Sequence, residues 1–559
     1  MDESTDTTGE PRAFDKRDLL LICAVVVLAV VVRVVFFRGL VSNDEFNYLR
    51  HAAEVWKGRF EPGDIGFFHG TRPVIFVPVA WAFALFGVSE LSALIWPFAA
   101  SIVTVILTFW IGRRLFDREH AVYAALLAAF VPLLVDESTR LLPGAIMNLV
   151  ITASVTCFLV SENTGRLRTL WLLVSGVLLG AMLLTVEIGL IFGIVFPLFV
   201  LLKRRAPRGL IRDVLGYWPL AVGFTAVVVA NTVYYWVETG NPLFRSEVSR
   251  MVLATTASEI RPVYYLKAML NPLGADGGVF YLAGAGALAA LLGRRREALV
   301  VLGWFIVSWL FLEYATTSLT EYRPLYKSVR YLSVAAVPGV LLAAVGLVWI
   351  RGLVMRTTRG GAAPAVVAGD RGDAAPGGVA GGGTPRAGGA SAAAVVLAAL
   401  IVVFLLSVVT LQKAGPGIDI RRAGLHDVEG YVRGADAETI YTAHWFWNTA
   451  VGFFMDFEPE YFPSGYDPYH AVDVKTVDPD TKNRYVQTLS PGDEMGAGIL
   501  IHDRFLFEAS LGRELSYGVG KGEIPIQMGQ LAEHFELVDS IAMTANRVVE
   551  IYSVTAGER

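Results

Sequence analysis

Long apolar segments with few charges recur through the first 412 residues of the chain. A segment of about 17–23 such residues is long enough to cross the hydrocarbon core of a bilayer, which is about 30 Å thick. Only 18% of the residues are charged, whereas a soluble protein carries roughly a quarter. The mean hydropathy of +0.52 agrees with this pattern. The sequence therefore predicts a polytopic membrane protein whose membrane part is all-α.

We predict about eleven transmembrane helices, which lie near residues 18–37, 91–112, 119–135, 143–160, 169–186, 188–202, 214–236, 278–292, 297–314, 331–350 and 392–412. The further apolar segment 73–88 decides the topology, because Lys and Arg beside spans mark the cytoplasmic side. If this segment does not cross, all the basic clusters fall on one side of the membrane. If it crosses, the clusters alternate between sides. We therefore expect a helix along the outer surface here, with the N-terminus cytoplasmic and the C-terminus outside.

Composition divides the whole chain into five parts. These are a polar, disordered cytoplasmic N-terminus (1–16), a transmembrane domain (17–350) with an outer loop (39–90), a cytoplasmic linker rich in Gly, Ala and Pro (351–391), the last transmembrane helix (392–412) and an extracytoplasmic domain (413–559). Residues 417–559 hold 23 Asp and Glu against 11 Lys and Arg, so the last domain is acidic. Strand-like segments at 438–447, 497–503 and 547–554 and a helix-like segment at 526–535 predict that it is a small α/β domain.

Two neighbouring carboxylates follow the first apolar segment, in the stretch VSNDEFNYLRHAAEVWKGRF. Ser42 or Asn43 can cap a helix there, and Asp44 and Glu45 would then lie in its first turn and complement its dipole. A well-capped amphipathic surface helix explains both acids without any chemistry. The alternative is that they act at the membrane face, and the local sequence leaves both interpretations open.

Other polar groups gather on the same predicted side of the membrane. The first loop adds His69 and Arg72, the loop DESTRLLPG adds Asp136, Glu137 and Arg140, and a short turn adds Glu187. The loop ATTSLTEYRPLYKSVR brings Arg323, Lys327 and Arg330 together before a span. A carboxylate such as Glu187 near the end of a span indicates function by default. Arg330 could instead simply extend to the interface.

This combination of acids and bases fits one kind of chemistry. A phosphate at a bilayer surface is bound by Arg or Lys, whose donors match its oxygens and neutralise a leaving group. An acceptor hydroxyl needs a carboxylate within hydrogen-bond reach to take its proton. A lipid-phosphate-linked sugar attacked by an acceptor alcohol needs both groups. A transporter would instead place polar groups and broken helices at the middle of the membrane.

The order of segments resembles a known family. A first span, NDEFNYLRHAAEVWKGRF, the Pro-led helix RPVIFVPVAWAFALFGVSE and a span that ends IGRRLFDRE are similar to the N-terminal third of the polyprenyl-phosphate-sugar-dependent membrane glycosyltransferases. These are the protein O-mannosyltransferases and the aminoarabinose transferases of lipid A, which have the GT-C fold. The segment KSVRYLSVAAVPGVLLAA resembles the later span that begins Arg-Tyr-Leu. The resemblance covers most of residues 17–350 in layout.

The resemblance implies roles for several residues. Asp44 matches the family's catalytic Asp, with Glu45 beside it, and Arg330 would contact the lipid phosphate, to which we add Lys327, Arg323 and Arg72 as candidate ligands. The acceptor or auxiliary groups would be drawn from Asp136, Glu137, Arg140, Glu187 and His69. The implied reaction is an inverting displacement on the anomeric carbon.

The chain departs from the family pattern in two places. The family often has His-Pro-Pro or Lys-Pro where this chain has Arg72-Pro73-Val74, and often an Asp where Gly144 follows Pro143. Asp136 or Glu137 could cover for that missing acid. The Trp-Trp-Asp signature of oligosaccharyltransferases is absent, which argues against transfer of a whole glycan to Asn.

The metal requirement stays open. Family members differ in metal use, and the sequence has no His, Cys and acid cluster at metal-ligand spacing. The two cysteines, Cys23 and Cys157, lie inside apolar segments and are explained as small buried hydrophobic residues.

We therefore expect a multi-pass plasma-membrane glycosyltransferase, a hexosyl- or pentosyltransferase with a polyprenyl- or dolichyl-phosphate sugar donor. Its acceptor would be protein, lipid or polysaccharide, its other partners membrane lipids, and no nucleic-acid partner is expected. One alternative is a non-catalytic protein that binds or transports lipid phosphates or glycans on the same scaffold. Another is that the acidic C-terminal domain does the work and the spans only anchor it.

Overall fold

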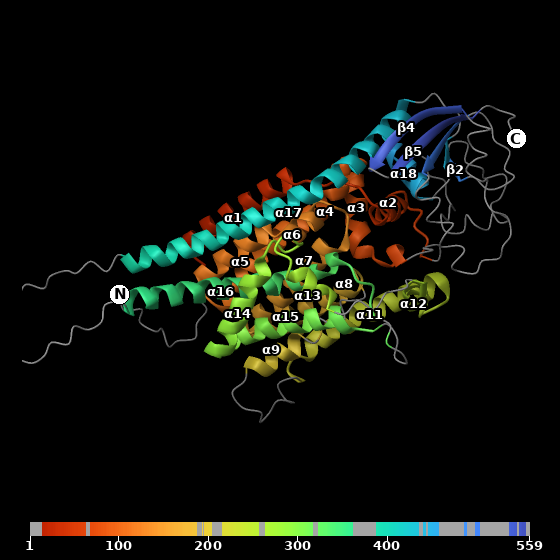
Figure 1. Cartoon of the computed structure of the whole chain (residues 1–559). Helices are drawn as coiled ribbons and strands as arrows, with labels where there is room; N and C mark the ends of the chain where they lie inside the picture. Colours follow the sequence, from red (N-terminus) through yellow and green to blue (C-terminus); the bar gives the residue numbers. More distant parts are fainter. Residues whose placement is uncertain are drawn as a thin grey trace, which may run out of the picture.

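The computed structural model describes residues 14–62, 68–186, 193, 195–203, 215–255, 263–316, 322, 324–360, 387–434, 440–442, 445–457, 486–488, 498–503, 536–544 and 547–554. A bundle of long helices makes up most of this part of the chain, and a small sheet lies beyond one end of the bundle (Figure 1). The predicted fold class, a helical membrane bundle with a small C-terminal sheet domain, is confirmed.

Eight helices of the described part are long and apolar enough to cross a membrane. They are α1 (Lys16–Val35), α4 (Glu90–Leu115), α7 (Pro143–Ser161), α8 (Arg168–Leu183, preceded by the 3-10 turn η3, Gly165–Leu167), α11 (Trp218–Thr239), α15 (Arg296–Tyr314), α16 (Ser333–Gly360) and α17 (Ala387–Gly434). A ninth span is possible if α5 (Arg118–Phe130) and α6 (Pro132–Ser138) count as one, because they meet at a 58° bend where Pro132 interrupts the helix.

The remaining two of the eleven predicted segments form shorter helices. These are α9 (Val195–Lys203, 9 residues) and α14 (Val279–Gly293, 15 residues). A helix of 15 residues rises about 22 Å, which is less than the thickness of the hydrocarbon core. Two further short helices, α12 (Phe244–Thr255) and α13 (Tyr264–Met269), come between α11 and α14 in the chain.

The chain between α1 and α4 forms two helices that are too short to span. Helix α2 (Asn43–Trp56) is followed by the 3-10 turn η2 (Phe68–Thr71) and by α3 (Pro73–Phe86). Helix α3 has 14 residues, a rise of about 21 Å. It packs between α2 and α4, and the indole Nε1 of Trp96 donates to the carbonyl oxygen of Val74 at 3.0 Å. This geometry agrees with the interpretation of 73–88 as a helix that does not cross.

A network of charged side chains lies at the end of the bundle that is away from the sheet. Arg118 Nε lies 2.6 Å from Asp18 Oδ1, and Arg113 Nε lies 3.3 Å from Asp18 Oδ2. Arg351, in α16, pairs with Glu119. These contacts join the start of α1, the end of α4, the start of α5 and the later part of α16, at the end of the bundle where the chain begins (Figure 1). The predicted basic clusters around these residues therefore share one end.

Helix α17 has 48 residues and continues past the predicted end of the last span at residue 412. It leads to a sheet with strand order β2-β1-β3-β5-β4. The strands are β1 (Ile440–Thr442), β2 (Val486–Thr488), β3 (Gly498–Asp503), β4 (Glu536–Thr544) and β5 (Arg547–Val554), with helix α18 (Trp445–Phe454) after β1. Strand β1 is parallel to β2 and β3, and β5 is antiparallel to β3 and β4.

The predictions for this domain are correct in part. The segments at 498–503 and 547–554 are strands, as expected. The predicted strand at 438–447 is wrong in its second half, because the aromatic residues from Trp445 onward form helix α18 instead. Strand β4 was not predicted. The helix-like segment 526–535 lies outside the described residues. The predicted linker 351–391 is wrong at both ends, because α16 continues to Gly360 and α17 begins at Ala387. The middle of that linker, 361–386, lies outside the described residues.

Candidate active site

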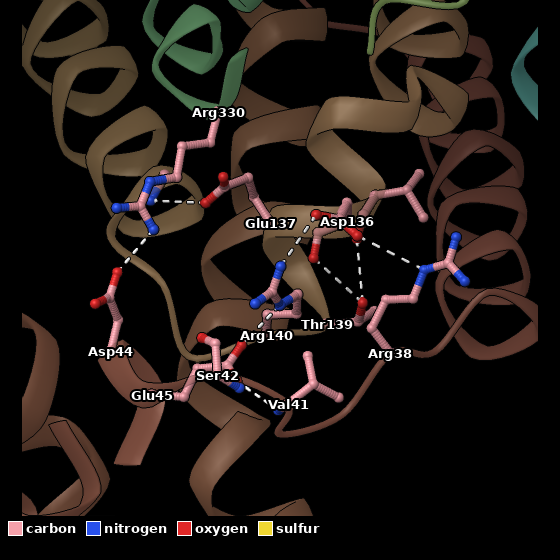
Figure 2. Close-up of polar contacts among 12 residues, drawn as sticks. Arg38, Val41, Ser42, Asp44, Glu45, Asp136, Glu137, Thr139, Arg140 and Arg330 are labelled. Carbon is pink, nitrogen blue, oxygen red and sulfur yellow. Dashed lines mark hydrogen bonds and ion pairs between the residues drawn. The ribbon is translucent and has the colours of Figure 1, made fainter. Parts of the chain in front are cut away.

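Asp44 lies in the first turn of α2, at the end of the bundle that carries the sheet. Glu45 starts this helix by accepting from the backbone N–H of Ser42 at 2.6 Å, which is the Glu half of a capping box. Arg330, in the 3-10 turn η5 (Val329–Leu332) just before α16, donates from Nη1 to Asp44 Oδ2 at 2.8 Å (Figure 2). On the other carboxylate oxygen, His69 Nε2 of η2 lies 3.5 Å from Oδ1. Two of the basic residues selected from the sequence thus contact the carboxylate of Asp44.

The surroundings set the charges of this group. Burial raises the pKa of the Asp44 carboxyl, but the hydrogen bonds from His69 and Arg330 and the charge of Arg330 outweigh burial and hold it well below its usual range. Burial lowers the pKa of the His69 imidazole to about 4, although the contact with Asp44 opposes this. At neutral pH the site therefore holds an ionised Asp44 beside a neutral His69.

Arg72 reaches the same cluster through Tyr48. Its Nη1 donates to the Tyr48 hydroxyl at 2.9 Å, and its guanidinium lies over the Phe68 ring, 4.2 Å from the centroid. The Tyr48 ring meets the His69 ring edge-on, with 4.9 Å between centroids. Burial raises the pKa of Tyr48 to about 12, so its hydroxyl stays protonated. Tyr48 was not selected from the sequence, but its place one helical turn after Asp44 is a signal that could have found it.

Glu45 faces away from this cluster and is fully buried. Its Oε2 accepts from the backbone N–H groups of Val41 and Ser42, at 2.6 Å each, and its Oε1 accepts from Arg140 Nε at 2.7 Å (Figure 2). Both carboxylate oxygens are therefore already engaged in holding the start of α2. The geometry favours a structural role for Glu45 rather than the catalytic one expected for it.

The acids of the second loop have different surroundings. Asp136 lies 3.6 Å from Arg38 Nε and 3.7 Å from Arg140 Nη1, and is part of the chain of contacts that holds the first loop. Glu137 is buried, accepts from the backbone N–H of Gly144 at 3.1 Å and points toward Arg330 (Figure 2). The Arg330 guanidinium thus lies between two carboxylates, those of Asp44 and Glu137.

Glu137 also occupies the space beside residue 144. A Cβ at Gly144 would lie 2.6 Å from Glu137 Cδ and even nearer to Oε2. Gly144 is the position at which the resembling family often has an Asp. The structure therefore brings a carboxylate from the preceding turn to the place where that Asp would project, which agrees with the expectation that a nearby acid could cover for it.

Lys327 lies apart from Asp44. Its Nζ donates to the carbonyl oxygens of Leu312 (2.9 Å) and Glu313 (2.5 Å) and lies 3.4 Å from Glu313 Oε1. Glu313 in turn accepts from the backbone N–H groups that begin α13. This ammonium thus joins the end of α15 to the start of α13. Two further predicted residues, Arg323 and Glu187, lie outside the described residues.

Within the described ranges, no group of three or more His, Cys, Asp or Glu side chains is arranged to hold a metal ion. The cluster around Asp44 presents cationic donors and one ionised acid. Such donors fit an anionic group such as a phosphate, with a proton acceptor beside it.

Residues 70–236 match the model of the dolichyl-phosphate-mannose-protein mannosyltransferase family. The matched residues include Arg72 and the second loop but neither Asp44 nor Arg330. No curated protein matches the chain by sequence.

Solved structures match over much more of the chain. The Cupriavidus metallidurans ArnT structure bound to undecaprenyl phosphate has a TM-score of 0.59 at 16% identity, over 95% of this chain and 97% of that one. The oligosaccharyltransferase of Archaeoglobus fulgidus in the apo form has a TM-score of 0.51 at 15% identity, over 78% of this chain. The chain spans 64% of the length of that oligosaccharyltransferase.

These likenesses agree with the resemblance seen in the sequence. ArnT and the oligosaccharyltransferase are both GT-C fold glycosyltransferases, and at such low identity the match speaks for the fold. The chain is a multi-pass membrane protein with the GT-C fold, similar to the membrane glycosyltransferases that act with polyprenyl phosphates.

Proposed function

We propose that the protein transfers a monosaccharide from a polyprenyl- or dolichyl-phosphate carrier to an acceptor, with Asp44 as the general base. The observation that carries this proposal is the pairing of the ionised Asp44 with Arg330, 2.8 Å apart, at one end of the membrane bundle. The structural neighbour ArnT was solved with undecaprenyl phosphate bound, which supports a lipid-phosphate donor. Two matched functions, proton removal and phosphate binding, thus meet in adjacent side chains.

The reaction would be a single inverting displacement. The acceptor hydroxyl or amine gives its proton to Asp44 as its oxygen or nitrogen attacks the anomeric carbon. The bond between that carbon and the phosphate oxygen breaks, and the electron pair leaves with polyprenyl phosphate. Arg330 would neutralise the charge that develops on the leaving phosphate.

Donor binding would also tune the base. Asp44 is a weak base while Arg330 and His69 hold its pKa low. A phosphate that shares the Arg330 guanidinium would offset part of that positive charge, so the pKa of Asp44 would rise toward its usual range. Proton transfer would then be favoured only when the donor is in place.

The neighbouring residues would position these two. Neutral His69 would orient the carboxylate of Asp44, and Glu137 would hold the Arg330 guanidinium from its other side. Arg72 would act through Tyr48. We do not place Lys327 at the phosphate, because its ammonium is already engaged by Leu312 and Glu313.

The sidedness of the site is part of the same proposal. The Asp44 end would face the extracytoplasmic side of the plasma membrane and the Asp18 end the cytoplasm. The Lys and Arg residues beside the helices at the Asp18 end support this orientation.

Replacing Asp44 by Asn tests the base. In proteoliposomes supplied with polyprenyl-phosphate sugars and envelope acceptors, D44N should lose about 10²–10⁴-fold in transfer rate, the usual contribution of a general base. Asp539→Asn, the same chemical change on the exposed strand β4, is the matched control and should leave transfer unchanged. Full transfer by D44N with an active donor would contradict the assignment. Mass spectrometry of envelope glycans from a deletion strain would identify the sugar.

One observation favours a second candidate. With the donor absent, Arg330 is already flanked by Asp44 and Glu137, an arrangement that a non-catalytic binder of lipid phosphates could also use. Such a protein would bind polyprenyl phosphate as tightly as an enzyme does, but it would transfer no sugar to any envelope acceptor in a prolonged incubation.

A further inference from the structure

The short segment that joins α1 to α2 delivers Asp44 to the site, and it is held by contacts with α4, the second loop and α17. Glu90, at the start of α4, accepts from the backbone N–H of Leu40 at 2.9 Å through Oε1. The same carboxylate pairs with Arg422 of α17, whose Nε lies 3.2 Å from Oε1 and whose Nη2 lies 2.5 Å from Oε2. A residue 332 positions from Glu90 in the sequence therefore orients the acceptor of a hydrogen bond four residues before Asp44.

Gly39 shows how close this contact is. Its φ is +75°, a left-handed conformation that favours glycine. A Cβ at this position would lie 2.7 Å from Arg422 Nε and 3.0 Å from Glu90 Cδ. The backbone N–H of Gly39 donates to the carbonyl oxygen of Thr139 at 3.1 Å. The segment thus passes through a space bounded by α4, the second loop and α17, and only a glycine fits there without strain.

Two more contacts tie the same segment to α17. Arg38, which is buried, donates from Nη2 to the carbonyl oxygen of Leu411 at 2.5 Å. The Arg422 guanidinium lies over the Phe37 ring, 5.1 Å from its centroid. Both of these contacts join the segment to the long C-terminal helix. A part of the chain that follows the predicted linker therefore helps to fix the segment, together with Glu90, Thr139 and Glu45.

The far side of α2 rests on α18. The Phe46 ring meets the rings of Phe446 and Phe453 edge-on, with centroids 5.1 Å and 6.0 Å apart. Phe46 is fully buried by these contacts. Asp44 and Phe46 are two residues apart on a helix and so project on nearly opposite faces. The C-terminal domain thus holds α2 on the face nearly opposite the one from which Asp44 meets Arg330.

We propose that Arg422 and Glu90 are positioning residues for catalysis. Together they hold the segment before α2 so that the Asp44 carboxylate meets Arg330 and the acceptor in one geometry. The C-terminal helix and α18 would then be part of the catalytic assembly rather than a separate module on an anchor. The kinetic part of this inference rests on the proposed function; the structural part does not.

Kinetics of the full-length protein test the proposal. Arg422→Ala and Glu90→Gln should lower kcat for transfer by about 10–100-fold, because a displacement of about 1 Å at a catalytic group can have that effect. The KM for the polyprenyl-phosphate donor should stay unchanged, since Arg330 is not altered. Arg422→Lys should recover part of kcat, because an ammonium can pair with only one side of Glu90. The control is Arg433→Ala, also in α17, which removes pairs with Glu429 and Asp456 but no contact with the segment.

Amide hydrogen exchange separates this proposal from the proposed function. In R422A and E90Q the amides of residues 38–45 should exchange faster than in the parent, and in R433A they should not. If these amides exchange faster in R422A and E90Q but the parent protein transfers no sugar, the positioning contact is supported and the glycosyltransferase activity is rejected. Unchanged exchange would overturn the positioning role, and so would a rise in KM with kcat unchanged.

Discussion

The carboxylate of Glu137 and the side chain at residue 144 compete for one space. Glu137 reaches Arg330 only because residue 144 is a glycine. The resembling family often has an Asp at the equivalent of residue 144, and such a side chain would project from the start of the helix. This chain reaches a similar arrangement from the preceding turn, with the Gly144 N–H fixing the carboxylate at 3.1 Å. The two acids are thus alternative solutions for one place beside the guanidinium.

This exchange can be tested by moving the acid. Gly144→Asp alone should abolish transfer and lower thermal stability, because the new side chain collides with Glu137. Glu137→Ala alone should lower transfer about tenfold or more, since Arg330 loses one carboxylate partner. The double variant E137A/G144D should recover part of both transfer and stability. Transfer and thermal unfolding measured for all three variants decide the matter: strictly additive losses would show that the two positions do not share a space.

Single residues also show what sequence reasoning could reach. Asp44 and Arg330 were selected together because a family resemblance joined them, although 286 positions separate them. Lys327 was selected because it lies in the same charged loop as Arg330, yet its ammonium binds carbonyl oxygens at the end of α15. A cluster of charges in a loop does not reveal which of them meet backbone acceptors, because these depend on where neighbouring helices end. For the same reason the contact of Glu45 with Arg140, 95 positions away, emerges only in the fold.

Helix α17 illustrates this at the level of elements. Hydropathy places its end near residue 412, because the apolar stretch stops there. The helix nevertheless runs to Gly434, although Pro416 and several glycines in this extension disfavour a helix. One of its faces still has buried residues, among them Leu425, Val428 and Val432. That face packs on strand β4. Hydropathy locates a span, but the length of a helix beyond the membrane is set by what it packs against.

Two glycines in this extension give a matched test of the packing. A Cβ at Gly424 would lie 2.6 Å from Met543 Sδ and 2.9 Å from the carbonyl oxygen of Ala542 in β4, whereas a Cβ at Gly430 meets nothing within 4 Å. Gly430→Ala should therefore stabilise the protein by about 0.5–1 kcal/mol through helix propensity. Gly424→Ala should lower the unfolding temperature, because the sheet must move away from the helix. Equal effects of the two substitutions on thermal unfolding would show that α17 and β4 are not packed as described.

On the scale of the whole molecule, charged groups are sorted between the two ends of the bundle. Asp18, Arg113 and Arg118 form a network at one end, and the pairs Asp44–Arg330 and Glu45–Arg140 lie at the opposite end. The sequence predicted this separation from the positions of Lys and Arg beside the spans. It could not predict that the C-terminal domain would close over the first loop, because the aromatic contacts of Phe46 with α18 join segments about 400 positions apart.

Cysteine labelling tests which end faces outward. Ser540→Cys places a thiol on the exposed strand β4, and Arg17→Cys places one on the exposed start of α1. The native Cys23 is exposed on α1 and Cys157 is half-buried in α7, whereas the sequence predicted that both are buried. Both lie within candidate spans, where lipid would shield them from a membrane-impermeant maleimide, so the parent chain is the control. In intact cells S540C should react with this reagent, while R17C should react only after permeabilisation, because the orientation proposed above puts the end with the Lys and Arg residues in the cytoplasm. The reverse pattern would place Asp44 on the cytoplasmic side and contradict the proposed orientation of the site.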